Sequence, residues 1–221
     1  MAFTFFFRDQ HVLELVVRHV VPALSGRSRP RVWDAGCAMG QEPYSLAILF
    51  AERMNPFGYN NLRFDVSDLD ECDTFGSIIR EGAYPWEELE RVPGDLFTKY
   101  FEEVGPKRYR VVDRVRSRLA FRKHDLLSLQ PVGRDYSLVL CKNVLLHFQP
   151  AERVEVIRMF HSALAPGGFF ATEQTQKMPP ELEPLFEQVV ADGQVFRKVE
   201  GTPCECSVPR GTALSTPPTS F

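Results

Sequence analysis

Hydrophobic positions along the chain alternate between the spacing of helices and the spacing of strands. Apolar residues stand at 13, 16, 17, 20 and 24, so one helical face runs from a candidate N-cap at Asp9 to Gly26. The next segment, 31–36 (RVWDAG), is short and apolar, which is typical of a buried strand. It leads into a helix over 42–54 with Pro43 near its first turn. The chain therefore begins with a helix, a strand and a second helix.

The remaining pattern continues this alternation to about residue 200. A near-continuous apolar run over 135–143 indicates a strand buried in a parallel sheet. The other expected strands are 62–68, 168–175 and 194–200, and the other expected helices are 70–84 (ending near Gly82), 87–101, 150–164 and 181–193. Strands that alternate with helices predict an α/β fold, in which a doubly wound sheet carries helices on both faces.

One segment interrupts this alternation of strands and helices. Residues 108–123 (RYRVVDRVRSRLAFRK) alternate between polar and apolar, which predicts two strands of an antiparallel hairpin. We expect a small β-subdomain at about 105–123, inside a single domain that spans 1–200. Residues 201–221 are rich in Pro, Ser and Thr, so we expect them to form a tail.

Composition places the chain among ordinary globular proteins. It has 221 residues, of which 44% are hydrophobic and 25% are charged, and its net charge is −3. Net acidity argues against whole-molecule attraction to nucleic acid, and no apolar run is long enough for insertion across a membrane. The start, MAFTFFFRDQ, lacks the basic region of a signal peptide. Five scattered cysteines without a CxxC motif favour a reduced, cytoplasmic chain and no metal site.

The turn between the first strand and the second helix, DAGCAMGQEP at 34–43, is the most informative stretch. A strand, a glycine turn and a helix form a nucleotide-binding loop, in which Gly36 lets the backbone approach a ligand. A dinucleotide loop needs a free helix N-terminus for phosphate, but the first turn of this helix holds Glu42. A carboxylate there fits a cationic ligand without phosphate, such as S-adenosyl-L-methionine (SAM), which has sulfonium and α-ammonium groups. Asp68, at the end of the second strand, is placed to bind the ribose hydroxyls.

Further motifs follow this turn along the chain. In order, the chain contains TFFFRD (4–9), DAGCAMGQEPYSLA (34–47), VSDLD (66–70), REGAY (80–84), HDLL (124–127), CKNVLLHF (141–148) and LAPGGFF (164–170). Together they resemble the chemotaxis receptor methyltransferases of the CheR family. The resemblance implies the Rossmann-like sheet of class I SAM methyltransferases with a small antiparallel β-subdomain. It also implies SAM as cofactor, S-adenosyl-L-homocysteine as product, and methylation of glutamate side chains on bacterial chemoreceptors.

The resemblance also implies where the cofactor binds. Position by position, the family's site falls on Thr4, Arg8, Glu42, Asp68, Asp125, Leu126, Asn143 and Val144. Asp125 and Leu126 are expected to hold the adenine, one by a polar contact and one by apolar cover, and Asn143 to serve the methionine part. The chain departs from the family's motifs at several positions. It has Ala2, Asp125, Lys142 and His147 where the family has Asn, Asn, Arg and Tyr, and it has Thr175-Gln176 for the closing Ser-Glu. We also expect the family's N-terminal helical domain to be absent before Ala2.

Two residues are candidates for catalysis. Methyl transfer to a carboxylate needs a positioned acceptor rather than a strong base, because the carboxylate is already ionised at neutral pH. The guanidinium of Arg8 would orient such an acceptor; alternatively, Arg8 is a surface residue before a helix cap. His147 would serve as a base if the acceptor were a hydroxyl or an amine; alternatively, it is a half-buried histidine after a strand. The aromatic run at 5–7 either packs in the core or covers the cofactor cleft.

Several functions stay open from these residues. The leading hypothesis is O-methylation of a protein glutamate. The alternatives are a methyltransferase of the same fold that acts on another protein or small-molecule acceptor, and a SAM-binding module without turnover. A strand face with Arg114, Arg116 and Arg118 would dock an acidic protein, or is simply solvated. Sparse aromatic residues among these arginines argue against a nucleic-acid partner.

Overall fold

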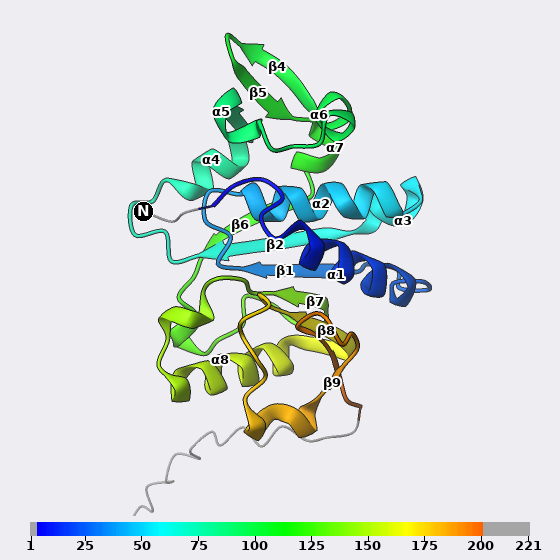
Figure 1. Ribbon diagram of the computed structural model, residues 1–221, viewed down its shortest axis with the longest axis vertical. Coiled ribbons are helices and arrows are strands. Elements are labelled where there is room, and N and C mark those ends of the chain that lie inside the picture. The colour runs from blue at the N-terminus through cyan, green and yellow to red at the C-terminus, as the bar shows by residue number, and fades with distance from the viewer. Residues whose placement is uncertain (1–3, 201–221) are drawn as a thin grey trace, which may run out of the picture.

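The computed structural model describes residues 4–200 and arranges them around a seven-stranded sheet (Figure 1). The strands lie in the order β6 (Leu119–Lys123), β2 (Arg63–Asp68), β1 (Arg31–Ala35), β7 (Tyr136–Leu140), β8 (Leu164–Ala171), β10 (Val195–Lys198) and β9 (Phe186–Gln188). The first five are parallel, and β10 is antiparallel to both of its neighbours. This is the doubly wound α/β sheet that the sequence predicts. Ala2 and the expected tail, 201–221, lie outside the described residues.

The central strand β1 separates two cores. It pairs with β2 on one side and with β7 on the other. Val32 packs into a core that includes residues of the first two helices, whereas Trp33 and Ala35 pack into the core on the opposite face. Because side chains alternate along a strand, Asp34 points to the same face as Val32.

Helices cover both faces of the sheet (Figure 1). α1 (Gln10–Ala23) and α2 (Gln41–Arg53) pack on the face of Val32, and α8 (Pro150–Ala163) packs on the other. Phe6 and Phe7, in the segment before α1, are buried in the first core. Within residues 4–200, none of the helices combines the length and the apolar character required to cross a membrane.

The small antiparallel sheet differs from the expected hairpin. It consists of β3 (Ala83–Pro85), β5 (Arg108–Val111) and β4 (Phe101–Gly105), in that order. Residues 119–123 do not fold back on β5 but form β6, which is parallel to β2 at the edge of the large sheet. The expected hairpin at 108–123 is therefore wrong, because an exposed edge strand has the same polar–apolar alternation as a hairpin strand. The helices of this part are α3 (Pro56–Asn61), α4 (Phe75–Glu81), α5 (Trp86–Leu89), α6 (Gly94–Tyr100) and α7 (Asp113–Arg116).

The arginines of this region do not share a strand face, so that expectation is also wrong. Arg114 and Arg116 belong to the short helix α7, and Arg118 lies in the turn before β6. Each donates a hydrogen bond to a main-chain carbonyl group of a neighbouring segment, at 2.5–3.1 Å. These guanidinium groups therefore fasten the segment to the rest of the domain.

The expectation of a helix over 181–193 is wrong as well. The chain forms the 3-10 helix η3 (Pro180–Leu185) and then β9, which pairs with β10. Pro184 has no N–H group and its ring crowds the preceding turn, which disfavours an α-helix across this segment. The other 3-10 helices, η1 (Leu126–Ser128) and η2 (Leu145–His147), follow β6 and β7.

His161 on α8 is a titratable group inside the second core. Its ring packs edge-on against Phe186, with 5.2 Å between the ring centroids. Burial, together with the positive charges of Lys198 and Arg158, lowers the pKa of His161 to about 4. The folded protein therefore keeps this imidazole neutral at pH values where an unfolded chain protonates it.

We predict that His161→Leu makes the fold less sensitive to acid. The unfolded imidazole binds a proton below about pH 6.5 and the folded one only near the lowered pKa, so stability falls as the pH falls through this window. In the wild type this group should cost on the order of 2–3 kcal/mol of unfolding free energy between about pH 7 and pH 4. Urea unfolding at several pH values measures the slope. His11→Gln, at an exposed histidine, should keep the wild-type slope; an unchanged slope in His161→Leu would contradict the prediction.

Candidate functional site

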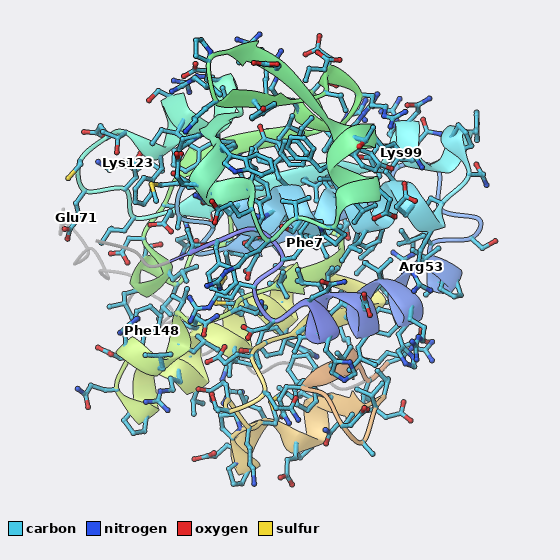
Figure 2. All side chains as sticks on the ribbon, turned by 45° about the horizontal axis from the view of Figure 1, so that its top comes forward. Phe7, Arg53, Glu71, Lys99, Lys123 and Phe148 are labelled. Carbon is cyan, nitrogen blue, oxygen red and sulfur yellow. The ribbon has the colours of Figure 1, made fainter. Side chains whose placement is uncertain are left out.

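A cavity of about 700 Å³ lies at the carboxyl ends of four neighbouring parallel strands. The loops after β1, β2, β6 and β7 line it, together with the segment before α1. It is lined by all ten residues expected from the sequence, namely Thr4, Arg8, Gly36, Glu42, Asp68, Asp125, Leu126, Asn143, Val144 and His147. In Figure 2, Phe7 marks the central segment before α1, and Phe148, which also lines the cavity, marks the side of α8. The carboxyl edge of the sheet is where open α/β folds bind ligands.

The turn after β1 requires glycine at two positions. Gly36 and Gly40 have φ angles of +99° and +98°, in the left-handed region that favours glycine. A Cβ atom on Gly36 would lie 2.1 Å from Val144 Cγ2, so the turn and the loop after β7 approach closely only without a side chain. The Ala38 N–H donates to Asp68 Oδ2 at 2.9 Å. The turn is thereby tied to the end of β2.

Glu42 is buried in the first turn of α2, where it forms an ion pair with Lys142. Glu42 Oε2 accepts from Lys142 Nζ at 2.9 Å, whereas Oε1 has no hydrogen-bond partner among the described residues. Lys142 Nζ also donates to the Arg8 carbonyl at 3.1 Å and lies 3.4 Å from Asp9 Oδ2. Burial raises the pKa of Glu42 above its ordinary value, although Lys142 opposes the shift. Lys142 was not expected in the site, because lysines are seldom fully buried.

Arg8 is held at the cavity by a segment with an unusual backbone. Its neighbours Phe7 and Asp9 have φ angles of +58° and +52°, which are uncommon for residues other than glycine. The Phe7 N–H donates to Ser45 Oγ at 2.8 Å and so fixes this segment on α2. Arg8 Nη2 then donates to Asn143 Oδ1 at 3.2 Å, across to the loop after β7. Strained backbone that persists because its surroundings hold it is a common feature of functional sites.

A carboxylate at the end of β8 supports the loop that carries Asn143. Asn143 has a φ angle of +58°, and its N–H donates to Glu173 Oε2 at 2.9 Å. The Thr172 hydroxyl donates to the same oxygen at 2.7 Å. The hydroxyl–carboxylate pair at this strand end is therefore Thr172-Glu173.

Asp68 and Asp125 bring two more carboxylates to the cavity. Asp68 ends β2, and its Oδ1 accepts from the Asp70 N–H at 3.3 Å. Asp125 is the N-cap of η1, and its Oδ1 accepts from the Leu127 N–H at 2.9 Å. A carboxylate has about four acceptor positions, so both groups are oriented and still able to bind a ligand. Leu126, next to Asp125, adds an apolar surface to the wall.

These residues fit SAM. The buried Glu42 Oε1 has no partner in the described part of the chain, and an ammonium donor satisfies such an oxygen. Asp68 offers acceptors to ribose hydroxyls, and Leu126 offers apolar cover to a base. Three carboxylates in one cavity disfavour a phosphate-rich ligand, because like charges repel.

The remaining residues that line the cavity are His147 and several residues that the sequence analysis did not single out. His147 lies in η2 on the cavity wall and is exposed, rather than half-buried as one interpretation expected. The lining residues that were not expected from the sequence are Cys37, Ala38, Ser67, Leu69, His124, Leu127, Lys142, Leu146 and Phe148. Each lies within two positions of an expected residue, so sequence proximity to the motifs was the available signal.

Comparisons with known proteins found a family model and several relatives that are similar to this chain. The family model for the "CheR methyltransferase, SAM binding domain" matches residues 2–195. A probable chemotaxis protein methyltransferase of Rhizobium etli is 28% identical over 85% of this chain and 72% of its own length. Chemotaxis protein methyltransferase 1 of Pseudomonas aeruginosa is 31% identical over 80% of this chain and 67% of its own. Among solved structures, one match is magnesium protoporphyrin IX methyltransferase (ChlM) from Synechocystis PCC 6803 with bound SAM. The alignment covers 86% of this chain and 78% of the ChlM chain, with a TM-score of 0.48 and 16% sequence identity.

We predict that Gly36→Ala weakens SAM binding at least about tenfold, which corresponds to about 1.4 kcal/mol. The added Cβ collides with Val144 and the φ angle strains any other residue, so the loop after β7 must move. Calorimetric titration with SAM measures the affinity. Gly94→Ala is the matched control, because a Cβ at Gly94 meets no atom within 4 Å. Wild-type affinity in Gly36→Ala would show that the close approach of the two loops is not needed.

Proposed function

This chain belongs to the CheR methyltransferase family, and from that premise we propose that it transfers the methyl group of SAM to a glutamate side chain of a chemoreceptor. The chain is a SAM-dependent methyltransferase, since the match to the family's SAM-binding domain spans residues 2–195. The choice of a carboxylate acceptor rests on one observation in particular. The guanidinium of Arg8 lines the cavity beside Asn143, and such a group binds carboxylates in a fixed geometry.

The proposed cofactor site extends across the loops at the strand ends. Glu42 would bind the ammonium group through Oε1, and Asp68 would bind the ribose hydroxyls. Asp125 and Leu126 would hold the adenine, and Asn143 would contact the methionine part. The remaining parts of the proposed cofactor wall are Thr4, Arg8, Gly36 and Val144.

Methyl transfer from SAM to a carboxylate requires little of the protein beyond positioning the two reacting groups. The bound cofactor supplies an electrophilic methyl group, which a carboxylate oxygen can attack without losing a proton. The task of Arg8 is then to hold one acceptor oxygen in line, and its contact with Asn143 Oδ1 at 3.2 Å orients the guanidinium for this task. His147 is not needed as a base for this acceptor; its exposed place on the cavity wall suits contact with the substrate protein.

We also propose that the partner is an acidic segment of a receptor and that the reaction takes place in the cytoplasm. The acceptor is itself an anion, and Arg8 at the cavity favours negative charge nearby. The three cysteines in the described part of the chain, Cys37, Cys72 and Cys141, are unpaired, which suits a reducing compartment.

We predict that SAM with a labelled methyl group transfers the label to the cytoplasmic part of a chemoreceptor. Mild base should release this label, because a carboxyl ester hydrolyses under conditions that leave methylated amines intact. A receptor fragment whose candidate glutamates are replaced by alanine is the control and should take up no label. Base-stable label would mean a different acceptor. Bound SAM without any label on tested receptors would favour a binding module.

We predict that Arg8→Ala lowers kcat for the receptor about 100-fold, because a misplaced acceptor loses the alignment that displacement requires. SAM affinity, measured by calorimetry, should change by less than about tenfold, which is under about 1.4 kcal/mol. Arg8→Lys keeps the charge but not the planar fork and should recover only part of the rate. Arg158→Ala, on α8 and outside the cavity lining, is the control with wild-type rates. Full turnover in Arg8→Ala would remove the proposed role.

A further inference from the structure

Beneath the cavity, β1 carries a carboxyl group that the proposed reaction does not use. Asp34 is 0% exposed, and within residues 4–200 neither of its oxygen atoms has a hydrogen-bond partner. Burial of an ionised carboxylate without a partner is costly, so the environment favours the protonated form. A buried polar group of this kind calls for a functional explanation.

The geometry of two neighbouring strands places Asp34 close to the proposed ammonium site. Asp34 is opposite Leu140 in the register of β1 and β7, and Leu140 belongs to the core under α1 and α2. Lys142 lies two positions beyond Leu140, and its ammonium group bonds to Glu42 in the first turn of α2. Asp34 thus extends into the same layer as the Glu42–Lys142 pair.

Charges around this layer are unbalanced. One buried ammonium group, that of Lys142, faces the two buried carboxyl groups of Asp34 and Glu42. Burial raises the pKa of Asp34 well above its ordinary value, Glu42 raises it further, and Lys142 acts in the opposite direction. The other titratable or charged groups that face the Asp34 and Glu42 carboxyl groups are Lys142 after β7, Asp68 at the end of β2, Cys37 in the turn after β1, Cys141 after β7, and Arg8 and Asp9 before α1.

We propose that Asp34 and Glu42 share one proton in the cofactor-free enzyme, and that SAM binding expels this proton to solvent. The inference rests on the proposed function, which places the ammonium group of SAM beside Glu42. With the shared proton, the two carboxyl groups and Lys142 carry no net charge. When the proton leaves, the cluster has one negative charge, which the ligand ammonium balances. One carboxyl O–H bond breaks, water or buffer takes the proton, and no other bond changes.

This arrangement makes Asp34 a positioning residue that acts through Glu42. At pH values where the cofactor-free pair keeps its proton, the ionised pair forms only when a cation binds, so the site selects ligands with an ammonium group at that place. 5′-Methylthioadenosine has the nucleoside but no ammonium group, and its binding should therefore expel no proton. Affinity for SAM should rise with pH while the pair is protonated and level off once it is ionised.

Calorimetric titration in buffers with different ionisation enthalpies counts the protons. At about pH 6–7, the wild type should release about 0.5–1 proton per SAM bound, and the affinity should rise up to about tenfold per pH unit. 5′-Methylthioadenosine should give no release. A wild type that binds SAM without releasing a proton would overturn the inference and leave the proposed function intact. A wild type that does not bind SAM would overturn the proposed function, and the inference with it.

Two variants locate the proton. Asp34→Asn should still bind SAM but release less than about 0.2 proton, with an affinity that no longer rises with pH. Asp65→Asn is the matched control, since Asp65 is a buried aspartate of β2 that lies opposite Trp33, on the other face of the sheet. It should keep the wild-type release. Proton release by Asp34→Asn at the wild-type level would overturn the inference. If Asp34→Asn fails to fold, the wild type still tests the inference, because proton release should accompany the binding of SAM but not that of 5′-methylthioadenosine.

Discussion

The buried ammonium group of Lys142 is the interaction on which the arrangement of the site depends. It bonds to Glu42 Oε2 and to the Arg8 carbonyl and lies near the Asp9 carboxylate. These partners belong to α2 and to the segment before α1, whereas Lys142 follows β7. Loss of one member of a buried ion pair costs about 3–5 kcal/mol, because the other charge stays buried without compensation. This buried cation therefore joins the segment of Arg8 to the helix and the strand end that form the cofactor cavity, and the Phe7–Ser45 and Arg8–Asn143 hydrogen bonds reinforce the connection.

The topology supplies the second constraint. The small antiparallel sheet is inserted between β2 and β6, yet β6 returns parallel to β2 and ends at the same edge. The His124 N–H donates to the Asp68 carbonyl at 2.8 Å, so the loop that carries Asp125 begins directly beside the end of β2. The insertion can therefore vary in shape without displacing the residues proposed for the adenine and the ribose.

Local patterns predicted the parts of the site that local sequence determines. An apolar strand, a glycine turn and a helix follow one another within a few residues, so Gly36 and Glu42 were placed correctly in the cavity. The partner of β6 was not predictable in this way, because its pairing with β2 spans the whole inserted subdomain. The helix expected over 181–193 failed because Pro184 outweighs an amphipathic pattern. The burial of Lys142 depends on acidic groups from other segments, and only the fold brings them together.

The same physics explains why this nucleotide-binding loop suits a cationic cofactor. A helix N-terminus carries partial positive charge and ordinarily attracts phosphate. Here Glu42 occupies that first turn, while Asp34 lies below it and Asp68 beside the glycine turn. Lys142 offsets one of these carboxyl groups, but the main-chain amides of Ala38 and Asp70 donate to Asp68 without adding a full charge. The cavity therefore keeps an excess of acceptors, and a ligand with ammonium and hydroxyl donors satisfies them where a pyrophosphate would be repelled.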